Sequence, residues 1–408
     1  MTLGKLWTIA YRDLGRNRRR TLFTLIAVAL GLALLITLNG FIAGVWQDSI
    51  QNSIRLRTGH VQVRAAAYEE EKVSLKWEDL LTDADALAAQ ARGLSQVKAA
   101  APVLWATSIL QTANDSVGLR LYGIDPTSSL HEPIRDGLVA GEYLTPDDRS
   151  GILLGKRLAD TLGLRVGQNV SLTVIDADGQ PDEALFTVRG LYATGIPTYD
   201  DSAAFLPLAK AQAFTRAGNR ASAVVILLHR QQDADAVAAT LRSLGVAALT
   251  WEEMHQVLIQ ALETGLGFYV ILDGIVMLVV AVIIANTLLM AVFERVREVG
   301  ILAALGMKGR QILLMFLLQA LILGLFGVLL GFGLGSAAVW YLATVGIDAG
   351  EMASAAPEFA MGSTMYARFI PGTFASLSLW TLVIILLASL YPAWYAARLE
   401  PVRALHAV

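Results

Sequence analysis

The sequence lacks cysteine entirely and contains few charged residues. Without cysteine, the chain has no disulfide, no thiol nucleophile and no thiolate metal site. Cysteine usage therefore does not indicate whether the chain faces an oxidising or a reducing compartment. Only 16% of the residues are charged, whereas about a quarter are charged in an average soluble domain. The net charge of −3 excludes a broadly basic surface for nucleic acid. With a mean hydropathy of +0.53, the chain is too apolar to be wholly soluble and too charged to lie wholly in lipid.

Long apolar runs are what the sequence has in abundance. A helix needs about 20 mostly apolar residues to cross the hydrocarbon core of a bilayer. Four stretches qualify: 21–47, 266–293, 312–345 and 373–396. The first follows a basic leader, as a signal peptide does, but its apolar run exceeds the roughly 7–15 residues of a signal core and no small-residue cleavage site ends it. We therefore predict a retained anchor and four transmembrane helices.

Basic residues are unevenly spread over the segments that flank these helices. They crowd the first 20 residues, the segment 294–311 and the tail 397–408, whereas 346–372 holds Arg368 among acidic residues. Lysine and arginine in short flanking segments favour the cytoplasmic side. The pattern predicts that both termini and 294–311 are cytoplasmic in a bacterial inner membrane. Residues 48–265 and 346–372 are then periplasmic.

The segment 48–265 is long enough to fold around a core of its own. A strand–helix–strand pattern over 59–110 returns over 223–250. Between them lie short strand-like runs separated by turn signals such as Asp178-Gly179. We predict a large α+β extracytoplasmic domain of two subdomains, in which the outer one is inserted into the inner one at about 115–205.

The segment after the second apolar run changes abruptly from apolar to amphipathic at Phe293. One continuous helix would place four residues on one face: Glu294, Glu298, Ile301 and Leu305. It would also allow two ion pairs at i, i+3: Glu294–Arg297 and Arg295–Glu298. Gly306 is a helix-stop residue, and Lys308 and Arg310 suit the carboxyl end of a helix. Periodicity alone leaves an ordinary interfacial loop helix as the alternative.

The pattern N-x-x-x-M-x-x-x-E-R-x-x-E-x-G-x-x-x-A-L-G in this segment resembles the cytoplasmic coupling helix of the FtsX/MacB/LolC superfamily of ABC permeases. The matching residues are Asn286, Met290, Glu294, Arg295, Glu298, Gly300, Ala304, Leu305 and Gly306. The basic entry at 12–22 and the P-A-x-x-A…P-x-x-A-L ending at 392–405 are similar to the family's as well. Two departures are Trp394-Tyr395, where basic residues are common, and Gln319, where a glutamate is frequent.

The resemblance implies contact with a separate ATPase through 294–311. The residues expected to couple to it are Glu294, Arg295, Glu298, Gly300, Leu305, Gly306 and Lys308. The run Gly151–Arg157 is one residue short of a phosphate loop and has Arg157 at the hydroxyl position. We therefore expect no catalytic residue and no cofactor in this chain, with ATP and Mg²⁺ in the partner. The scattered histidines indicate no metal site.

The resemblance also implies partners: a cytoplasmic ABC ATPase dimer, a second permease copy that is identical or a paralogue, and a periplasmic chaperone or adaptor. Stretches at 151–167, 188–190 and 204–212 are similar to lipoprotein-releasing permeases. The expected function is mechanotransmission that extracts lipoprotein or lipid-like cargo from the outer leaflet. One alternative is an efflux permease for peptides or hydrophobic drugs. Another is a signal relay to a wall hydrolase, against which the large outer domain counts.

Within the apolar runs, the helices that flank the outer domain are the expected walls of a cargo route. The residues proposed for it are Leu34, Leu38, Phe41, Phe268, Ile271, Asp273 and Ile275. The alternative is that these side chains merely face lipid, with Asp273 reaching the membrane surface. Glycines between 324 and 335 give the third helix a small-residue face, which indicates close helix packing or dimerisation.

Overall fold

The computed structural model describes residues 3–16, 18–68, 72–355 and 359–399. The chain divides into two compact units. The first unit comprises Met1–Val45, Leu262–Ile347 and Tyr366–Val408, and the second comprises Trp46–Ala261 and Asp348–Met365. The part of the P-A-x-x-A…P-x-x-A-L ending that follows residue 399 lies outside the described residues.

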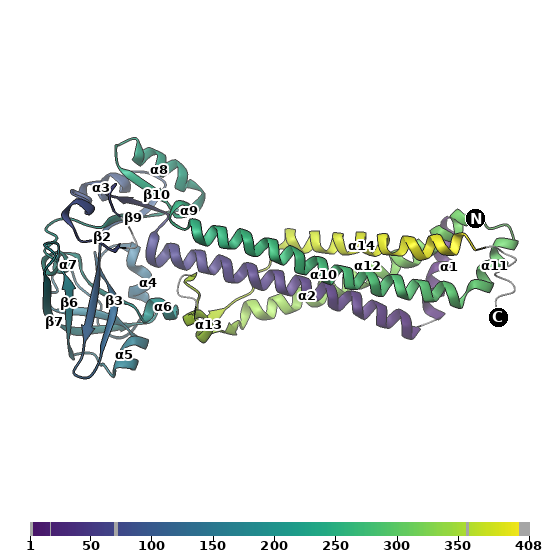
Figure 1. The fold of residues 1–408 in the computed structure, drawn as a ribbon, viewed down its shortest axis with the longest axis horizontal. Coiled ribbons are helices and arrows are strands. Elements are labelled where there is room, and N and C mark those ends of the chain that lie inside the picture. The colour runs from purple at the N-terminus through teal and green to yellow at the C-terminus, as the bar shows by residue number, and fades with distance from the viewer. Residues whose placement is uncertain (1–2, 17, 69–71, 356–358, 400–408) are drawn as a thin grey trace. The chain divides into compact units, whose positions relative to one another are not determined.

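The first unit is built from helices. Four are long and apolar enough to cross a membrane, which confirms the predicted fold class, and they run side by side (Figure 1). The long helices are α2 (Arg18–Ser53), α10 (Gln256–Glu294), α12 (Gly309–Thr344) and α14 (Pro371–Ala397). Two shorter helices complete the unit: α1 (Leu3–Arg16) and α11 (Val296–Ala304). The long helices extend beyond the predicted spans, because backbone hydrogen bonding continues after the apolar run ends, except that α12 ends at Thr344, one residue before the predicted end.

Close packing between α12 and α2 accounts for the glycines of the third apolar run. A Cβ added at Gly331 would lie 2.8 Å from the carbonyl oxygen of Ala29, and one at Gly335 would lie 2.8 Å from Cβ of Ile36. Gly327 approaches Val28 in the same way, and Gly324 faces Ile385 of α14. Gly333 meets nothing within 4 Å among the described residues. The small-residue face is therefore used within this chain, at all of these positions except Gly333.

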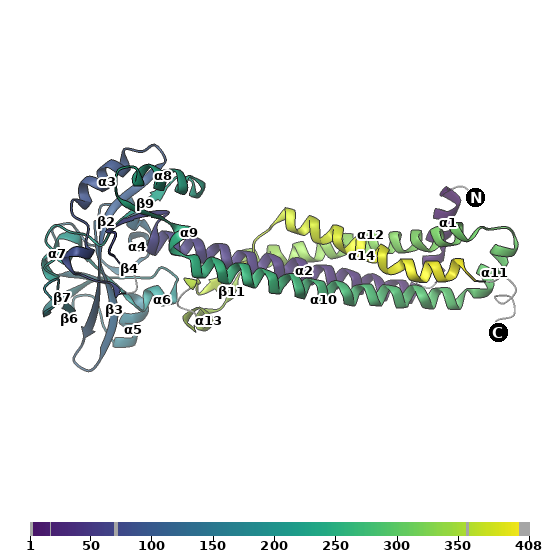
Figure 2. The same cartoon turned by 45° about the horizontal axis from the view of Figure 1, so that its top comes forward.

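The second unit contains a ten-stranded sheet. Its inner part has the strand order β10-β1-β9-β2, with α3 and α8 side by side on one face (Figure 1 and Figure 2). This order and the connections β1-α3-β2 and β9-α8-β10 form a split β-α-β pair. The elements are β1 (Val61–Arg64), α3 (Ala84–Arg92), β2 (Val97–Gln111), β9 (Ala223–Leu228), α8 (Ala234–Arg242), β10 (Ala247–Thr250) and α9 (Trp251–Met254).

The outer part is inserted between β2 and β9 and shares strand β2 with the inner part. Residues 97–103 of β2 pair with β9, whereas 104–111 pair with β3. The insert therefore begins inside β2 at Leu104, and the predicted start at about 115 is too late, because one long strand serves both parts. The remaining strands are β3 (Ser116–Ile124), β4 (Leu138–Gly141), β5 (Gly151–Gly155), β6 (Asn169–Ile175), β7 (Pro181–Tyr192) and β8 (Ala203–Pro207).

Short helices line the outer part, and the sequence analysis did not predict them. They are α4 (Glu132–Asp136), α5 (Lys156–Leu162), α6 (Pro197–Asp200) and α7 (Leu208–Phe214). The predicted loop 346–372 also contains regular structure, namely α13 (Gly350–Ala355) and a pair of two-residue strands, β11 (Ile347–Asp348) and β12 (Thr364–Met365). Two- to seven-residue elements carry too short a hydrophobic period to be recognised locally.

Candidate functional site

The predicted coupling segment is two helices rather than one. Helix α10 ends at Glu294, and α11 begins at Val296. Between them Arg295 has φ −119° and ψ 15°, which lies outside the helical range. The predicted single helix is therefore interrupted. Glu298, Ile301 and Leu305 lie exposed along α11, whereas Glu294, which is also exposed, belongs to α10 on the other side of the break. Glu294, Arg295 and Glu298 each pair with the N-terminal segment.

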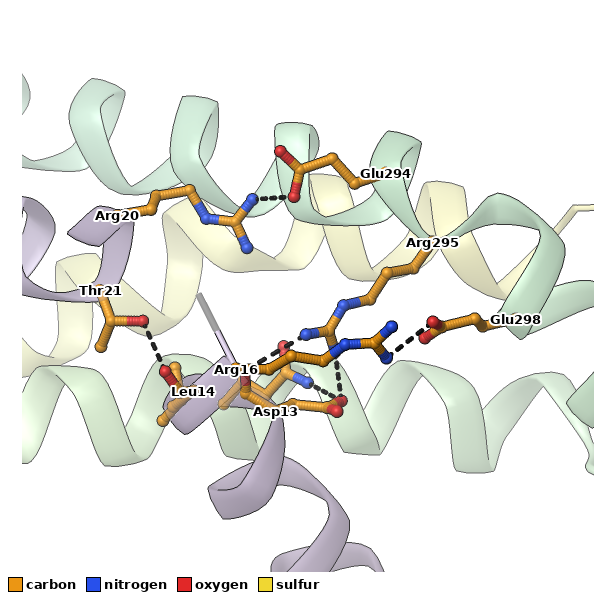
Figure 3. Close-up of polar contacts among 9 residues, drawn as sticks. Asp13, Leu14, Arg16, Arg20, Thr21, Glu294, Arg295 and Glu298 are labelled. Carbon is orange, nitrogen blue, oxygen red and sulfur yellow. Dashed lines mark hydrogen bonds and ion pairs between the residues drawn. The ribbon is translucent and has the colours of Figure 1, made fainter. Parts of the chain in front are cut away.

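Arg295 forms the central contact of this site. Its Nη1 lies 2.6 Å from Oδ2 of Asp13 in α1, and its Nη2 donates to the Asp13 carbonyl oxygen at 3.2 Å. Nε2 of Gln319, in α12, donates to the same carboxylate oxygen at 2.8 Å. Figure 3 shows the guanidinium pointing at Asp13. Three elements, α1, the α10–α11 break and α12, thus meet at one carboxylate.

The contact is largely shielded from solvent. The side chains of Arg295 and Asp13 are 10% and 20% exposed. Burial raises the pKa of the Asp13 carboxyl, and the Arg295 guanidinium opposes that rise by favouring the ionised form. Removing one member of such a pair leaves an uncompensated charge, which is costly in a low-dielectric setting.

Two outer ion pairs flank the Arg295–Asp13 contact (Figure 3). Arg16 lies 2.7 Å from Glu298, and Arg20 lies 2.5 Å from Glu294. The predicted i, i+3 pairs within the segment are replaced by these long-range pairs with α1 and α2. Exposed pairs of this kind each contribute little to stability. Together, however, they fix α10 and α11 against the start of the chain.

Apolar packing holds α11 against α1 and α12. Val299 and Gly300 are buried, and Val299 belongs to a cluster that includes Ala10 of α1 and Phe316 of α12. Gly300 is thus on the inner side of α11, toward its neighbours, rather than on an outward face. The helix ends at a turn in which Gly306 adopts φ +92°, a conformation that favours glycine.

The outward face of the segment includes two residues of the predicted face, Ile301 and Leu305, together with Arg297 and Lys308. Leu305 is 80% exposed and Ile301 is 44% exposed, and Arg297 and Lys308 are exposed as well. Arg297 has no ion pair among the residues that the structure describes. We call Arg297, Ile301, Leu305 and Lys308 the outward stripe. An exposed apolar pair bordered by two cations is an arrangement suited to a protein partner.

Inside the membrane region, Asp273 of α10 contacts Asn39 of α2. Nδ2 of Asn39 donates to the two carboxylate oxygens at 3.1 and 3.2 Å. The same amide also donates to the Leu35 carbonyl at 3.0 Å. The sequence analysis identified Asp273 but not Asn39, and this contact joins the two helices expected to wall the cargo route.

The other residues proposed for the cargo route do not share one surface. Leu34, Phe268, Ile271 and Ile275 are more than half exposed. Leu38 is half-buried, and Phe41 packs against a cluster that includes Leu32 and Phe374. Of the three residues proposed from α2, only Leu34 is exposed, because the helix turns Phe41 toward its neighbours.

Asp13 and Asn39 were not predicted as site residues, and Gln319 was noted only as a departure from the family pattern. Each left a signal: Asp13 is a lone acid in a basic leader, and the two amides interrupt apolar runs. Polar groups in such surroundings usually have partners. The segment that resembles a phosphate loop is strand β5 followed by α5, and a Cβ at Gly155 would collide with the Asp200 carbonyl. Among the residues described, no group of three acidic or histidine side chains is placed to hold a metal.

Two family models match the chain. A MacB-like periplasmic core domain covers residues 21–244, and an FtsX-like permease C-terminal domain covers residues 270–401. The chain is 26% identical to the lipoprotein-releasing system transmembrane protein LolC of Neisseria meningitidis serogroup B, over 96% of this chain and 95% of that protein.

Similarity extends to a second group of proteins. The chain is 26% identical to the macrolide export ATP-binding/permease protein MacB of Rhodospirillum rubrum, over 100% of this chain and 61% of that protein. The crystal structure of the periplasmic region of MacB from Actinobacillus actinomycetemcomitans aligns with a TM-score of 0.35 at 16% identity, over 51% of this chain and 97% of that one. With both family models matched in order, the chain belongs to the FtsX/MacB/LolC superfamily of ABC transporter permeases and is an inner-membrane protein.

Proposed function

We propose that this chain is the permease subunit of a mechanotransmission ABC transporter that extracts lipoprotein or lipid-like cargo from the outer leaflet of the inner membrane. The observation that carries the proposal is the charged contact at the α10–α11 break. It joins the segment that bears the outward stripe to α1, α2, α10 and α12 at once.

The outward stripe is the expected docking face for the ATPase. Members of the superfamily work with a cytoplasmic ABC ATPase. ATP-driven closure of that partner would push α11 at Ile301 and Leu305. The Arg295–Asp13 and Glu298–Arg16 pairs would pass the displacement to α1, and Glu294–Arg20 would pass it to α2. Because α10 ends directly at the break and its Glu294 is paired with Arg20 of α2, α2 and α10 would move together.

In this mechanism, ATP hydrolysis takes place in a partner protein and not in this chain. ATP and Mg²⁺ would be bound by a separate ATPase dimer, and two permease copies, identical or paralogous, would match its symmetry. The exposed apolar side chains of α10 leave a surface for the second copy or for lipid. A periplasmic chaperone or adaptor would receive the cargo.

The proposed orientation puts both termini and α11 in the cytoplasm. Basic residues gather at the N-terminus and around α11, as expected for that side. Reporter fusions at residues 150 and 360 are then expected to read periplasmic, and one at 305 cytoplasmic. A cytoplasmic signal at 150 would contradict the architecture on which the mechanism depends.

Two observations support a lipid-bearing cargo. One relative described above is named a lipoprotein-releasing system transmembrane protein, and α2 and α10 present exposed apolar residues near the Asn39–Asp273 contact. The similarity to a protein named as a macrolide exporter supports the second candidate, an efflux permease for peptides or hydrophobic drugs.

A photo-crosslinker separates these two candidates. It is placed at Phe268 of α10 in the complete complex, with Leu387 of α14 as the matched control, because both side chains are about 60% exposed. Lipoprotein adducts at Phe268 that disappear during ATP turnover, and do not form at Leu387, are expected. Equal capture of bulk phospholipid at both positions, unchanged by ATP, would contradict the lipoprotein proposal and favour efflux.

A further inference from the structure

A pocket of about 460 Å³ lies entirely within the second unit, where the first long helix meets the sheet. Asn52, Leu56 and Arg57 contribute from the end of α2 and the π-helical turn Ile54–Thr58 that follows it. Arg120 contributes from β3, and Thr198 and Tyr199 contribute from α6. Such π-helical turns are rare in proteins as a whole, and those that occur often lie at functional sites.

Two arginines in this pocket have no carboxylate. Arg57 and Arg120 are half-buried, and neither side chain has an ion pair or a hydrogen bond among the residues described. Several arginines elsewhere in the unit do have a carboxylate partner, for example Arg157 with Asp201 at 3.0 Å and Arg189 with Glu142 at 3.0 Å. Two partly desolvated guanidinium groups that share one concave site indicate an anionic ligand, since the guanidinium fork matches phosphate oxygens.

The rest of the pocket is rigid and offers further donors. The Tyr199 hydroxyl donates to the Leu56 carbonyl at 2.9 Å, which ties α6 to the π-helical turn. Tyr199 itself is buried and packs on Tyr122 with ring centroids 5.9 Å apart. The Thr198 hydroxyl lines the pocket and is not bonded to another described group. The site is thus held in place before a ligand arrives, which lowers the entropic cost of binding.

Neighbouring aromatics indicate where the ligand comes from. Trp46 packs edge-on against Phe359, with ring centroids 5.6 Å apart. Asn52, six residues further along α2, donates to the carbonyl of Ala360, which lines the pocket. Tryptophan is enriched at the level of lipid headgroups. The pocket therefore lies beside an aromatic pair of the kind found at the membrane surface.

We propose that this pocket binds the phosphate group of an anionic lipid, held by Arg57 and Arg120. A phosphodiester headgroup with a net negative charge satisfies both guanidinium groups, whereas a zwitterionic headgroup brings its own cation to the site. Free phosphate shares the recognised chemistry and is the alternative source. The inference is independent of which cargo the transporter moves.

The test uses the full chain. It is reconstituted in nanodiscs that contain equal amounts of phosphatidylglycerol and phosphatidylcholine, and native mass spectrometry then counts the lipids retained. Inorganic phosphate is titrated separately into the detergent-solubilised protein by calorimetry. The variants are Arg57→Gln and Arg120→Gln, with Arg149→Gln as the matched control, since Arg149 is an exposed arginine of the same unit outside the pocket.

Phosphatidylglycerol is expected to be retained over phosphatidylcholine, and each pocket variant is expected to lower that retention about tenfold, the effect of losing one charge-assisted contact. Arg149→Gln is expected to behave as the unaltered chain. Arg57→Lys, which keeps the charge, separates loss of binding from misfolding and is expected to recover part of it. Phosphate binding that needs both arginines, without lipid preference, would assign the site to free phosphate. Equal retention by all variants, with no phosphate binding, would overturn the proposal.

Discussion

Arg295 and Asp13 lie 282 positions apart in the sequence, yet a distance of 2.6 Å separates Nη1 of one from Oδ2 of the other. The pair sits where α10 stops and α11 begins, and Gln319 of α12 completes it. Because most of the contact is removed from water, it acts as a fixed joint between the N-terminal helix and the segment that bears the outward stripe.

Replacing Arg295 with methionine is expected to lower the free energy of unfolding by about 3–5 kcal/mol, because Asp13 is left as a shielded charge without its cation. Thermal unfolding of the detergent-solubilised chain measures the loss. Adding Asp13→Asn to Arg295→Met is expected to restore most of it, since the charge is removed. The matched control is Arg16→Met, which breaks the exposed Glu298 pair and is expected to cost about 0–1 kcal/mol. Similar losses for Arg16→Met and Arg295→Met would contradict the assignment of the fixed joint.

Gln319→Glu is expected to make stability depend on pH. The new carboxylate would lie at hydrogen-bond distance from Asp13, where the amide now donates at 2.8 Å, and two such carboxyls ionise together only at high cost. The pKa of Asp13 would then lie further above its unfolded value. The folded state would bind more protons than the unfolded state, so stability would fall as the pH rises through that pKa. Melting temperatures at pH 5 and pH 8 are the measurement, and a variant that melts at the higher temperature at pH 8 would refute the contact.

Leu305→Asp is expected to abolish binding of the ATPase while membrane insertion and melting temperature stay unchanged. Leu305 is 80% exposed and so contributes little to the fold, but it is the main apolar residue of the outward stripe. Co-purification of the partner and ATP-dependent transport are the measurements. Leu244→Asp is the matched control, since Leu244 is a 57% exposed leucine in the second unit. Full partner binding by Leu305→Asp would show that the ATPase docks elsewhere.

Gly331→Ala is expected to destabilise the helical unit by about 1–3 kcal/mol, the usual cost of overpacking. The added methyl would meet the Ala29 carbonyl and Leu32 of α2 at less than 3.0 Å. Gly333→Ala, two positions further along the same helix, meets nothing within 4 Å among the described residues and is expected to be neutral or slightly stabilising. Thermal unfolding of the two variants side by side is the test. Equal effects would mean that the glycines serve an interface outside this chain.

The fold class could be predicted from the sequence alone. A run of about 20 apolar residues is a local property, and it forms a helix in lipid whatever its neighbours are, because the backbone has no other partner there. The change at Phe293 from apolar to amphipathic is local in the same sense. Strand β9 (Ala223–Leu228) opens the strand–helix–strand pattern predicted over 223–250 for a related reason, since a short run of buried β-branched residues carries its own signal.

Only the tertiary structure decided which way the charged residues of the segment 294–311 face. Local spacing paired Glu298 with Arg295, three positions away, whereas the fold pairs it with Arg16 and gives Arg295 to Asp13. A partly buried guanidinium stabilises the fold most where it meets a carboxylate that is also shielded from water. That carboxylate is brought by a helix from the other end of the chain, so no local pattern can reveal it. The same holds for Asn39 and Asp273, whose contact depends on how α2 and α10 are rotated against each other.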